Sequence, residues 1–121
     1  KWQGPVPLTP PNIFPPGAAI AMAKQTKDVL NAIAVGNDGA LYRSWVVGGA
    51  EWNKPPPGTF ATPPFAPQPI TPKGMFNPGE GVALLNFNGV LEGFVIGKDG
   101  GIYTSWLPPS AGKWNGPVKI S

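Results

Sequence analysis

The chain carries one motif twice, as VGNDGALYRSW at residues 35–45 and as IGKDGGIYTSW at residues 96–106. In both copies an Asp-Gly pair stands between two runs rich in apolar, β-branched and aromatic residues. Such a pair is a strong hairpin signal, because a type I′ turn needs positive φ at both of its central residues. Each copy is therefore predicted to form a strand, a tight turn and a second strand. Two copies at a fixed spacing indicate a repeat protein.

The repeat extends beyond the hairpin on both sides. Residues 8–21 have counterparts in residues 70–83, and residues 1–9 match residues 113–121, so the chain is expected to begin with the closing strand of a repeat. Each repeat is predicted to contain four strands, at 18–23, 29–35, 40–45 and from Trp52 in the first copy, and at 81–87, 90–96, 101–106 and from Trp114 in the second. Turns are expected at 25–28 and 88–89, and loops at 47–50 and 108–112.

The first copy carries about twelve extra residues after Trp52. Residues 55–72 contain eight prolines, and proline cannot donate the backbone N–H that a strand interior requires. We expect this segment to run as an extended, polyproline-like excursion. The predicted organisation is a single repeat domain, with a closing strand at 1–9, a first blade at 10–71 and a second blade at 72–121.

The predicted fold class is all-β. The chain has 17 glycines and 18 prolines, but 41% hydrophobic residues and five tryptophans argue against disorder. Residues 32–35 are apolar on both faces of their predicted strand, and such a strand needs a neighbour on each face of its sheet. Stacked blades of a β-propeller supply both neighbours. We therefore predict two four-stranded antiparallel propeller-type blades plus an extra N-terminal strand, part of a β-propeller, with a β-sandwich as the alternative.

The composition argues against several kinds of function. The chain has no Cys and no His, which removes disulfides, thiol nucleophiles, zinc sites built on these residues and the usual general base. The nine basic residues are scattered singly, whereas nucleic-acid binders gather them on one face, so we expect no nucleic-acid partner. No apolar run reaches the length of a membrane span, so we expect no membrane insertion. The carboxylates do not recur as a pair outside the turns, so we expect no enzyme activity and no cofactor.

Two pairs of polar residues recur in the motif. Asp38 and Asp99 could indicate calcium, but a turn role is favoured because Asp readily hydrogen-bonds its own backbone. The alternating oxygen ligands of a calcium loop are also absent from the sequence, so we expect no metal. Asn53 and Asn115 each follow a tryptophan, and either a turn role or ligand donation fits them.

The repeat resembles the tandem units of bacterial β-propeller lectins, in particular the fucose-binding group typified by the Photorhabdus lectins. The shared pattern is an apolar strand, Gly-x-Asp-Gly, an apolar residue, Tyr, two variable residues and Trp, then a second Trp with Gly or Pro. The matching residues are Gly36, Asp38, Gly39, Leu41, Tyr42, Trp45 and Trp52 in the first copy, and Gly97, Asp99, Gly100, Ile102, Tyr103, Trp106 and Trp114 in the second. The resemblance covers nearly the whole chain except 56–69. Such lectins have six or seven blades, whereas this chain has two, and the proline excursion departs from their pattern.

Eight residues are candidates for carbohydrate binding: Tyr42, Arg43, Trp45, Trp52, Tyr103, Trp106, Trp114 and Trp2. An aromatic face can stack on the apolar C–H face of a sugar, and the same side chain could instead wedge between blades as core. A period of two places Tyr42 and Ser44 on one face of their strand, and Arg43 and Trp45 on the other. Arg43 is the only arginine and can donate two hydrogen bonds to neighbouring hydroxyls, whereas its counterpart in the second copy is Thr104.

The resemblance implies a lectin with shallow sugar sites between adjacent blades and no metal. Affinity for each site is expected to be weak, so the sites would act by multivalency on fucosylated or methylated glycans. Secretion is also expected. The alternative is a structural or protein-interaction propeller module of a larger assembly, which the proline excursion favours.

Two blades would leave two apolar sheet faces uncovered, and exposed patches of that size are rare on soluble monomers. We therefore expect a homo-oligomer, or a place in a larger repeat array. Residues 1–9 duplicate the fourth strand that residues 113–121 already supply. If prolines deprive the first blade of its own fourth strand, that blade could borrow residues 1–9.

Overall fold

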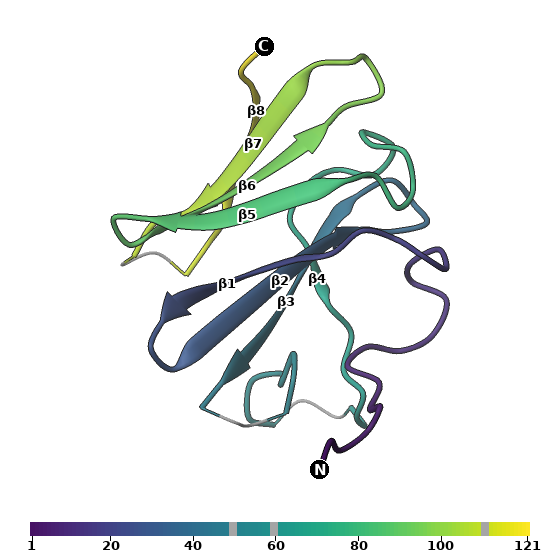
Figure 1. Cartoon of the computed structure of the whole chain (residues 1–121), viewed down its shortest axis with the longest axis vertical. Coiled ribbons are helices and arrows are strands. Elements are labelled where there is room, and N and C mark those ends of the chain that lie inside the picture. The colour runs from purple at the N-terminus through teal and green to yellow at the C-terminus, as the bar shows by residue number, and fades with distance from the viewer. Residues whose placement is uncertain (49–50, 59–60, 110–111) are drawn as a thin grey trace.

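The chain forms two four-stranded antiparallel sheets (Figure 1). The computed structural model describes residues 1–48, 51–58, 61–109 and 112–121, and contains no helix within them. The first sheet has the order β1 (Ala21–Thr26), β2 (Val29–Val35), β3 (Leu41–Val47) and β4 (Gln68–Pro69). The second has the order β5 (Val82–Phe87), β6 (Val90–Ile96), β7 (Ile102–Leu107) and β8 (Asn115–Lys119). The all-β prediction is confirmed.

Most strand predictions agree with the structure, but the fourth strand of the first copy does not open at Trp52, which lies in a turn. β2 and β6 have the predicted bounds. β1 begins at Ala21 and continues to Thr26, so the turn that follows it is confined to residues 27–28. β3 runs on to Val47, which had been predicted to open a loop. The rest of that loop, and the loop predicted at 108–112, include residues 49–50 and 110–111, which lie outside the described residues.

The Asp-Gly hairpins are not the predicted type I′ turns. Only the glycine of each pair has positive φ, 78° at Gly39 and 82° at Gly100. Gly39 N–H donates to the carbonyl of Gly36, and Gly36 N–H donates to the carbonyl of Ala40. This is the three-residue loop in which a tight turn is followed by a left-handed glycine. Positive φ at both central residues occurs instead in Asn88-Gly89, the turn between β5 and β6.

The first glycine of each motif makes room for the tyrosine. A Cβ atom on Gly36 would lie 2.7 Å from the ring of Tyr42, and one on Gly97 would lie 2.6 Å from the ring of Tyr103. Both distances are shorter than real Cβ contacts. The spacing Gly-x-Asp-Gly-x-x-Tyr therefore follows from one packing requirement, in which the tyrosine ring crosses the backbone at the base of its own hairpin.

The first sheet obtains its fourth strand from the end of the proline-rich excursion. Gln68 pairs with Arg43 and Pro69 with Tyr42, as Val118 and Lys119 pair with Thr104 and Tyr103 in the second sheet. The residue after each strand repeats the register, because the N–H groups of Ile70 and Ile120 both donate at 2.8 Å to the first residue of the third strand. The prediction that prolines exclude a strand here was wrong for these two residues, and the first blade does not need residues 1–9.

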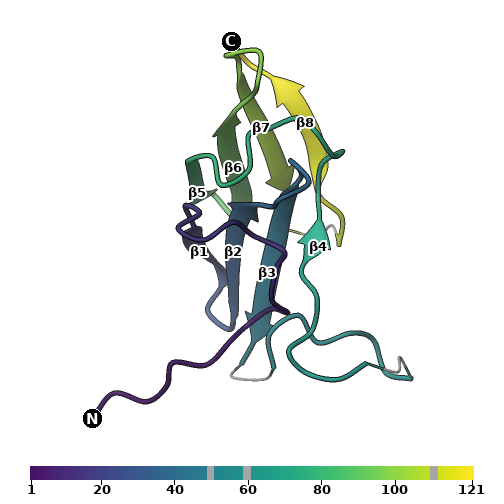
Figure 2. The same ribbon diagram turned by 90° about the vertical axis from the view of Figure 1, so that its right-hand side faces the viewer.

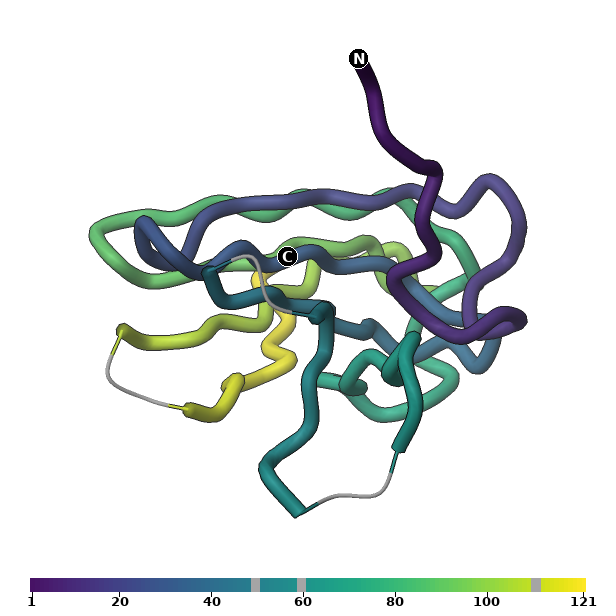
Figure 3. The backbone as a smooth tube through the Cα atoms, turned by 90° about the horizontal axis from the view of Figure 1, so that it is seen from below, coloured from purple at the N-terminus to yellow at the C-terminus, as the bar shows by residue number. Residues whose placement is uncertain are grey.

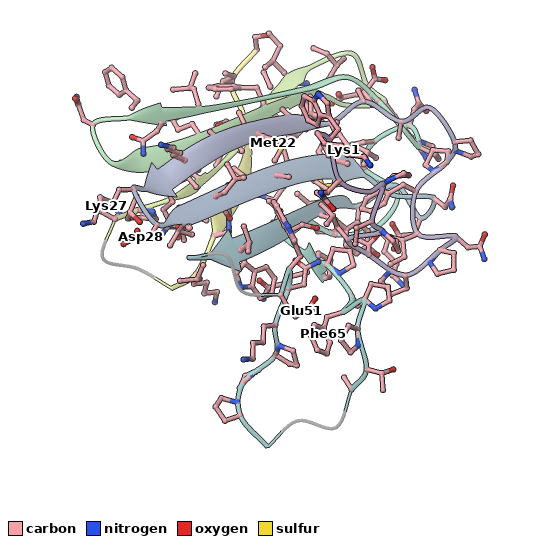
Figure 4. All side chains as sticks on the ribbon, turned by 60° about the horizontal axis from the view of Figure 1, so that its bottom comes forward. Lys1, Met22, Lys27, Asp28, Glu51 and Phe65 are labelled. Atoms are coloured by element: carbon pink, nitrogen blue, oxygen red, sulfur yellow. The ribbon has the colours of Figure 1, made fainter. Side chains whose placement is uncertain are left out.

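Asn53 fixes the start of the excursion. Its Oδ1 accepts the N–H of Trp45 at 3.0 Å, and its Nδ2 donates to the carbonyl of Phe65 at 3.3 Å. The side chain is buried, and its backbone has a φ of 58°. Of the two roles left open for Asn53, the turn role is the one observed. The loop then projects from the body, with Glu51 and Phe65 near its base (Figure 4).

The extra N-terminal strand is absent from the described structure. Residues 1–8 are exposed and form no strand, and the N-terminus extends away from the two sheets (Figures 2 and 3). The reason is that both sheet edges at which this segment could pair are already occupied. The position beside β7 that its matching segment takes is already filled by β8, and the equivalent position beside β3 is filled by β4.

The two sheets pack through non-equivalent faces. We call the side of each sheet that carries Tyr42 or Tyr103 its tyrosine face, and the opposite side, which carries Trp45 or Trp106, its tryptophan face. The tryptophan face of the first sheet packs on the tyrosine face of the second. The buried members of this core are Ile33, Val35, Leu41, Phe76 and Val95, with Val82, Leu84 and Tyr103 packed against them.

This packing is that of successive propeller blades. Contacts between the sheets are made chiefly by β1 and β2 with β5 and β6, and β1 and β5 lie side by side (Figures 1 and 3). The outer strands β3, β4, β7 and β8 diverge, as radial blades do. A sandwich would instead place the two sheets face to face across their full width. The head-to-tail order is also the one that a ring of repeated units requires.

We predict that Gly36→Ala and Gly97→Ala each lower the free energy of unfolding by about 1–3 kcal/mol, because the tyrosine ring must leave its place. Denaturant unfolding followed by tryptophan fluorescence measures this. Gly81→Ala is the matched control, since a Cβ there meets open space and its φ is not positive. Equal losses in all three variants would contradict the packing explanation.

Candidate functional site

Each hairpin tip is fastened by an aspartate–tyrosine pair. Asp38 accepts the N–H of Ala40 at 3.0 Å and the Tyr42 hydroxyl at 2.5 Å. In the second copy Asp99 accepts the N–H of Gly101 at 2.9 Å and the Tyr103 hydroxyl at 2.7 Å. Lys119 adds an exposed ion pair to Asp99 at 3.3 Å. Both aspartates are therefore engaged within their own hairpins.

These hydrogen bonds shift the pKa values of both partners. The N–H of Gly101, followed by the Tyr103 hydroxyl, lowers the pKa of Asp99 to about 2. Desolvation opposes the shift at Asp38, but the hydrogen bonds from Tyr42 and Ala40 outweigh it, so the pKa of Asp38 is also lowered. The bond to Asp38 raises the pKa of Tyr42 to about 12, and the bond to Asp99 raises the pKa of Tyr103. Each tyrosine hydroxyl thus remains a proton donor to its aspartate.

Arg43 and Trp45 form a stacked pair on the tryptophan face of the first sheet. The guanidinium carbon of Arg43 lies 4.3 Å from the centre of the Trp45 ring, a cation–π arrangement. Burial lowers the pKa of the Arg43 guanidinium, and its Nε is buried without a hydrogen-bond partner among the described residues. Arg43 pairs in register with Gln68. The pair therefore stands on the same face as Gln68, at the outer part of the sheet.

A cleft of about 370 Å³ separates the outer edges of the two sheets. One wall is the chain from Gln68 to Pro72, and the other contains Lys113, Trp114 and Gly116. Trp114 is buried, packs against Leu91 and Leu107, and its Nε1 has no acceptor within the described part of the chain. The hydroxyl of Thr71 is already engaged, since it accepts the Leu41 N–H and donates to the Pro72 carbonyl. The cleft combines an aromatic side chain with the amide of Gln68 and the ammonium of Lys113. Such a mixture suits a polar ligand with apolar C–H faces.

The structure divides the tryptophans and tyrosines between different surfaces. Tyr42 and Trp52 line a mainly apolar hollow of about 320 Å³ on the tyrosine face of the first sheet. Their counterparts Tyr103 and Trp114 lie on the equivalent face of the second sheet, which packs against the first. Each tyrosine also meets a phenylalanine edge to face, Tyr42 with Phe14 and Tyr103 with Phe76. Tyr103 is partly buried and packs against the core between the sheets.

Trp106 and Trp2 stand apart from the cleft. Trp106 shares the tryptophan face of the second sheet with Thr104, and no other sheet of the described structure covers that face. Trp2 is 99% exposed in the N-terminal segment. Of the eight candidates, Arg43 and Trp45 are in contact, Trp114 lines the cleft opposite Gln68, and Tyr42 and Trp52 share another hollow.

The cleft also contains residues that sequence reasoning did not select, namely Gln68, Thr71 and Lys113. The excursion concealed Gln68 and Thr71, because eight prolines dominate its pattern. A signal was present in the repeat itself. Residues 68–71 take the places of residues 118–121, and this alignment puts Gln68 where the second copy has the apolar Val118.

The described residues hold no group of three or more acidic side chains placed to bind a metal ion. Asp38 and Asp99 instead serve their hairpins. A helix of the length and apolarity that a membrane crossing requires does not occur in the described parts of the chain.

We predict that the aspartate–tyrosine pairs make stability depend on pH at both extremes. Asp99 has a lowered pKa in the folded state, so its contribution is present above pH 4 and is lost as the pH falls from about 4 to about 2. Tyr42 has a raised pKa, so its contribution is present below about pH 10 and is lost as the pH rises towards about 12. Thermal melting across both ranges should show a shallower acid slope in Asp99→Asn and a shallower alkaline slope in Tyr42→Phe. Asp28→Asn, which alters an exposed turn carboxylate, is the control, and slopes unchanged from wild type in all three would refute the assignment.

Comparison with known proteins finds similarity among solved structures. No protein-family model and no curated protein matches the chain. Among solved structures, the chain is similar to the BP39L lectin from Burkholderia pseudomallei, with 39% sequence identity and a TM-score of 0.83. The similarity covers 99% of this chain and 31% of that lectin, so the chain spans about a third of the lectin's length. Over nearly its whole length, the chain is therefore similar in both sequence and fold to part of a bacterial lectin.

Proposed function

We propose that this chain is a carbohydrate-binding unit whose sugar site is the cleft between the outer edges of its two sheets. The observation that carries the proposal is the similarity to a lectin at 39% identity over 99% of the chain. The cleft adds chemical support, because it joins Trp114 to the polar groups of Gln68 and Lys113. The Arg43–Trp45 pair extends this surface on the same face as Gln68.

The binding mode follows from the groups present. An indole ring offers an apolar face to the C–H side of a pyranose, and Trp114 is the indole that lines the cleft. Arg43 can donate to two adjacent hydroxyls, and stacking on Trp45 fixes the plane of its guanidinium. Gln68 offers both a donor and an acceptor. Fucosylated or methylated sugars fit this mixture, since their methyl groups enlarge the apolar side that an indole can cover.

Tyr42 and Tyr103 have a supporting role in this proposal. Their hydroxyls donate to Asp38 and Asp99, and the rings are packed against Phe14 and Phe76. We infer that these tyrosines hold the hairpins and do not contact the sugar. The same engagement of the two aspartates favours binding without catalysis.

A shallow cleft of this size gives weak affinity for a monosaccharide, so we propose that useful binding arises from several sites acting on one multivalent glycan. Such a protein would act outside the cell, where glycans are displayed. Several copies of the unit, or a longer array of repeats, would provide the sites.

A protein-interaction role is the second candidate, and the projecting proline-rich loop favours it. Pro56 and Pro57 of this loop are exposed. Consecutive prolines adopt an extended form that aromatic-lined grooves of other proteins bind. Under this proposal, replacing the exposed prolines by alanine would abolish partner binding and leave sugar binding unchanged.

We predict that Arg43→Thr weakens sugar binding about 10-fold, the loss expected for a charged hydrogen-bond donor. Threonine is the residue at the equivalent place in the second copy, so the substitution should preserve the fold. A glycan array of fucosylated and methylated saccharides identifies the probe, and titration with L-fucose measures the affinity.

NMR of the five tryptophan indole N–H groups locates the site in the same titration. The signals of Trp45 and Trp114 should shift. Trp2 is fully exposed, so its indole signal should not shift in the wild-type titration. Trp2→Ala is the matched control variant and should bind the sugar with wild-type affinity. A folded protein that binds no saccharide on the array, or that binds with no change at Trp45 and Trp114, would overturn the proposed site.

A further inference from the structure

Two sheet faces remain uncovered by any other sheet of the described structure, and they are complementary. One is the tyrosine face of the first sheet, which carries the hollow of about 320 Å³ and the half-exposed Met22 (Figure 4). The other is the tryptophan face of the second sheet, which carries a shallower depression of about 590 Å³ lined by Phe94, Ile96 and Ile102. The repeat makes these faces equivalent to the two faces that already pack together inside the chain. Phe94 and Ile96 take the places of Ile33 and Val35, and Met22 takes the place of Leu84.

The junction inside the chain is also closed by backbone hydrogen bonds from its connecting segment. The N–H groups of Gly74, Phe76 and Gly79 donate to the carbonyls of Asp38, Gly39 and Val35, at 2.9, 3.1 and 3.1 Å. These bonds attach residues 74–79 to the hairpin of the first sheet. On its other side the same segment accepts the N–H of Lys98, from the hairpin of the second sheet, at the carbonyl of Met75.

Residues 12–17 repeat this connecting segment, and half of its contacts are already made. Asn37 N–H donates to the carbonyl of Ile13 at 2.8 Å, as Lys98 N–H does to Met75. Asn12 has a φ of 70° and Gly17 a φ of 80°, close to the 77° and 75° of Gly74 and Gly79. Phe14 meets Tyr42 edge to face as Phe76 meets Tyr103. The segment is thus held in the shape that the internal junction uses.

The other half of its contacts has no counterpart within the described residues. The N–H groups of Asn12 and Phe14 make no backbone hydrogen bond there, and neither do the carbonyls of Asp99 and Gly100. The hairpin that carries these carbonyls, at Asp99 and Gly100, also has free space beside it. A Cβ on Gly39 would lie 2.8 Å from the carbonyl oxygen of Phe76, whereas a Cβ on Gly100 would meet nothing within 4 Å.

We propose that a second copy of this chain docks head to tail, placing its tyrosine face and residues 12–17 on the tryptophan face of the second sheet. Equivalence with the internal junction assigns the hydrogen bonds: Asn12 to Asp99, Phe14 to Gly100 and Gly17 to Ile96, from N–H to carbonyl. Residues 1–8 take no part, because β8 of the first copy fills the position that they match. Such docking would bring several sugar sites together in one assembly. Only this biological role rests on the proposed function, because the docking itself is argued from the repeat.

The test uses one charge on each face, in the absence of sugar. Ile96→Asp places a carboxylate on the tryptophan face of the second sheet, and Met22→Asp places one on the tyrosine face of the first. Sedimentation velocity should show wild-type protein as an assembly and each variant alone as a monomer, with association at least about 100-fold weaker. An equimolar mixture of the two variants should form a one-to-one dimer and nothing larger, because one intact pair of faces remains.

Controls separate this proposal from its alternatives. Val47→Asp alters an exposed apolar residue outside both faces, and deletion of residues 1–8 removes the segment that takes no part, so both should assemble like wild type. Circular dichroism confirms that every variant is folded. Sugar titration of the monomeric variants tests the cleft separately, since it lies within one chain. Wild-type protein that stays monomeric and folded at high micromolar concentration, or Met22→Asp that assembles normally, would overturn the proposal.

Discussion

The packing of one tryptophan face on one tyrosine face is the contact on which the rest of the structure depends. β2 is too apolar to leave either side in water, and Ile33 and Val35 are almost completely buried where the second sheet covers them. Because the two faces are different, the contact has a direction. A unit built this way always presents one face of each kind at its ends, unlike a sandwich of two equivalent faces, which closes on itself.

The glycine, aspartate and tyrosine of the hairpin motif serve this packing. Glycine, aspartate and tyrosine form one device in each copy: the glycine admits the ring, and the aspartate accepts the hydroxyl. The ring then presents its outer side to a phenylalanine of the connecting segment. Without the glycine the tyrosine ring does not fit, and without the tyrosine the aspartate loses a hydrogen bond. This mutual dependence explains why all three residues occur in both copies while the residues between them differ.

Differences between the copies lie at the outer edges of the sheets, where the candidate site is found. Arg43 faces Gln68 across β3 and β4, whereas Thr104 faces Val118 across β7 and β8. The excursion supplies the polar wall of the cleft, and the second copy supplies its tryptophan and lysine. The core that both copies share is thus separate from the outer edges, where the copies differ in sequence. Residues at the outer edges can therefore change their ligand contacts without disturbing the stacking of the sheets.

The sequence by itself determined the repeat, the all-β class, the bounds of β2 and β6 and the alternation that puts Tyr42 and Trp45 on opposite faces. These are local properties, because strand periodicity and turn residues act within a few positions. Tertiary structure decided which faces meet, and so it placed Tyr103 and Trp114 in the junction and left Trp106 on an uncovered face. It also decided that Gln68 and Pro69 complete the first sheet and that residues 1–8 do not, because a strand forms only where a sheet edge is free to pair with it. That condition depends on every other segment competing for the edge, and no single stretch of sequence contains it.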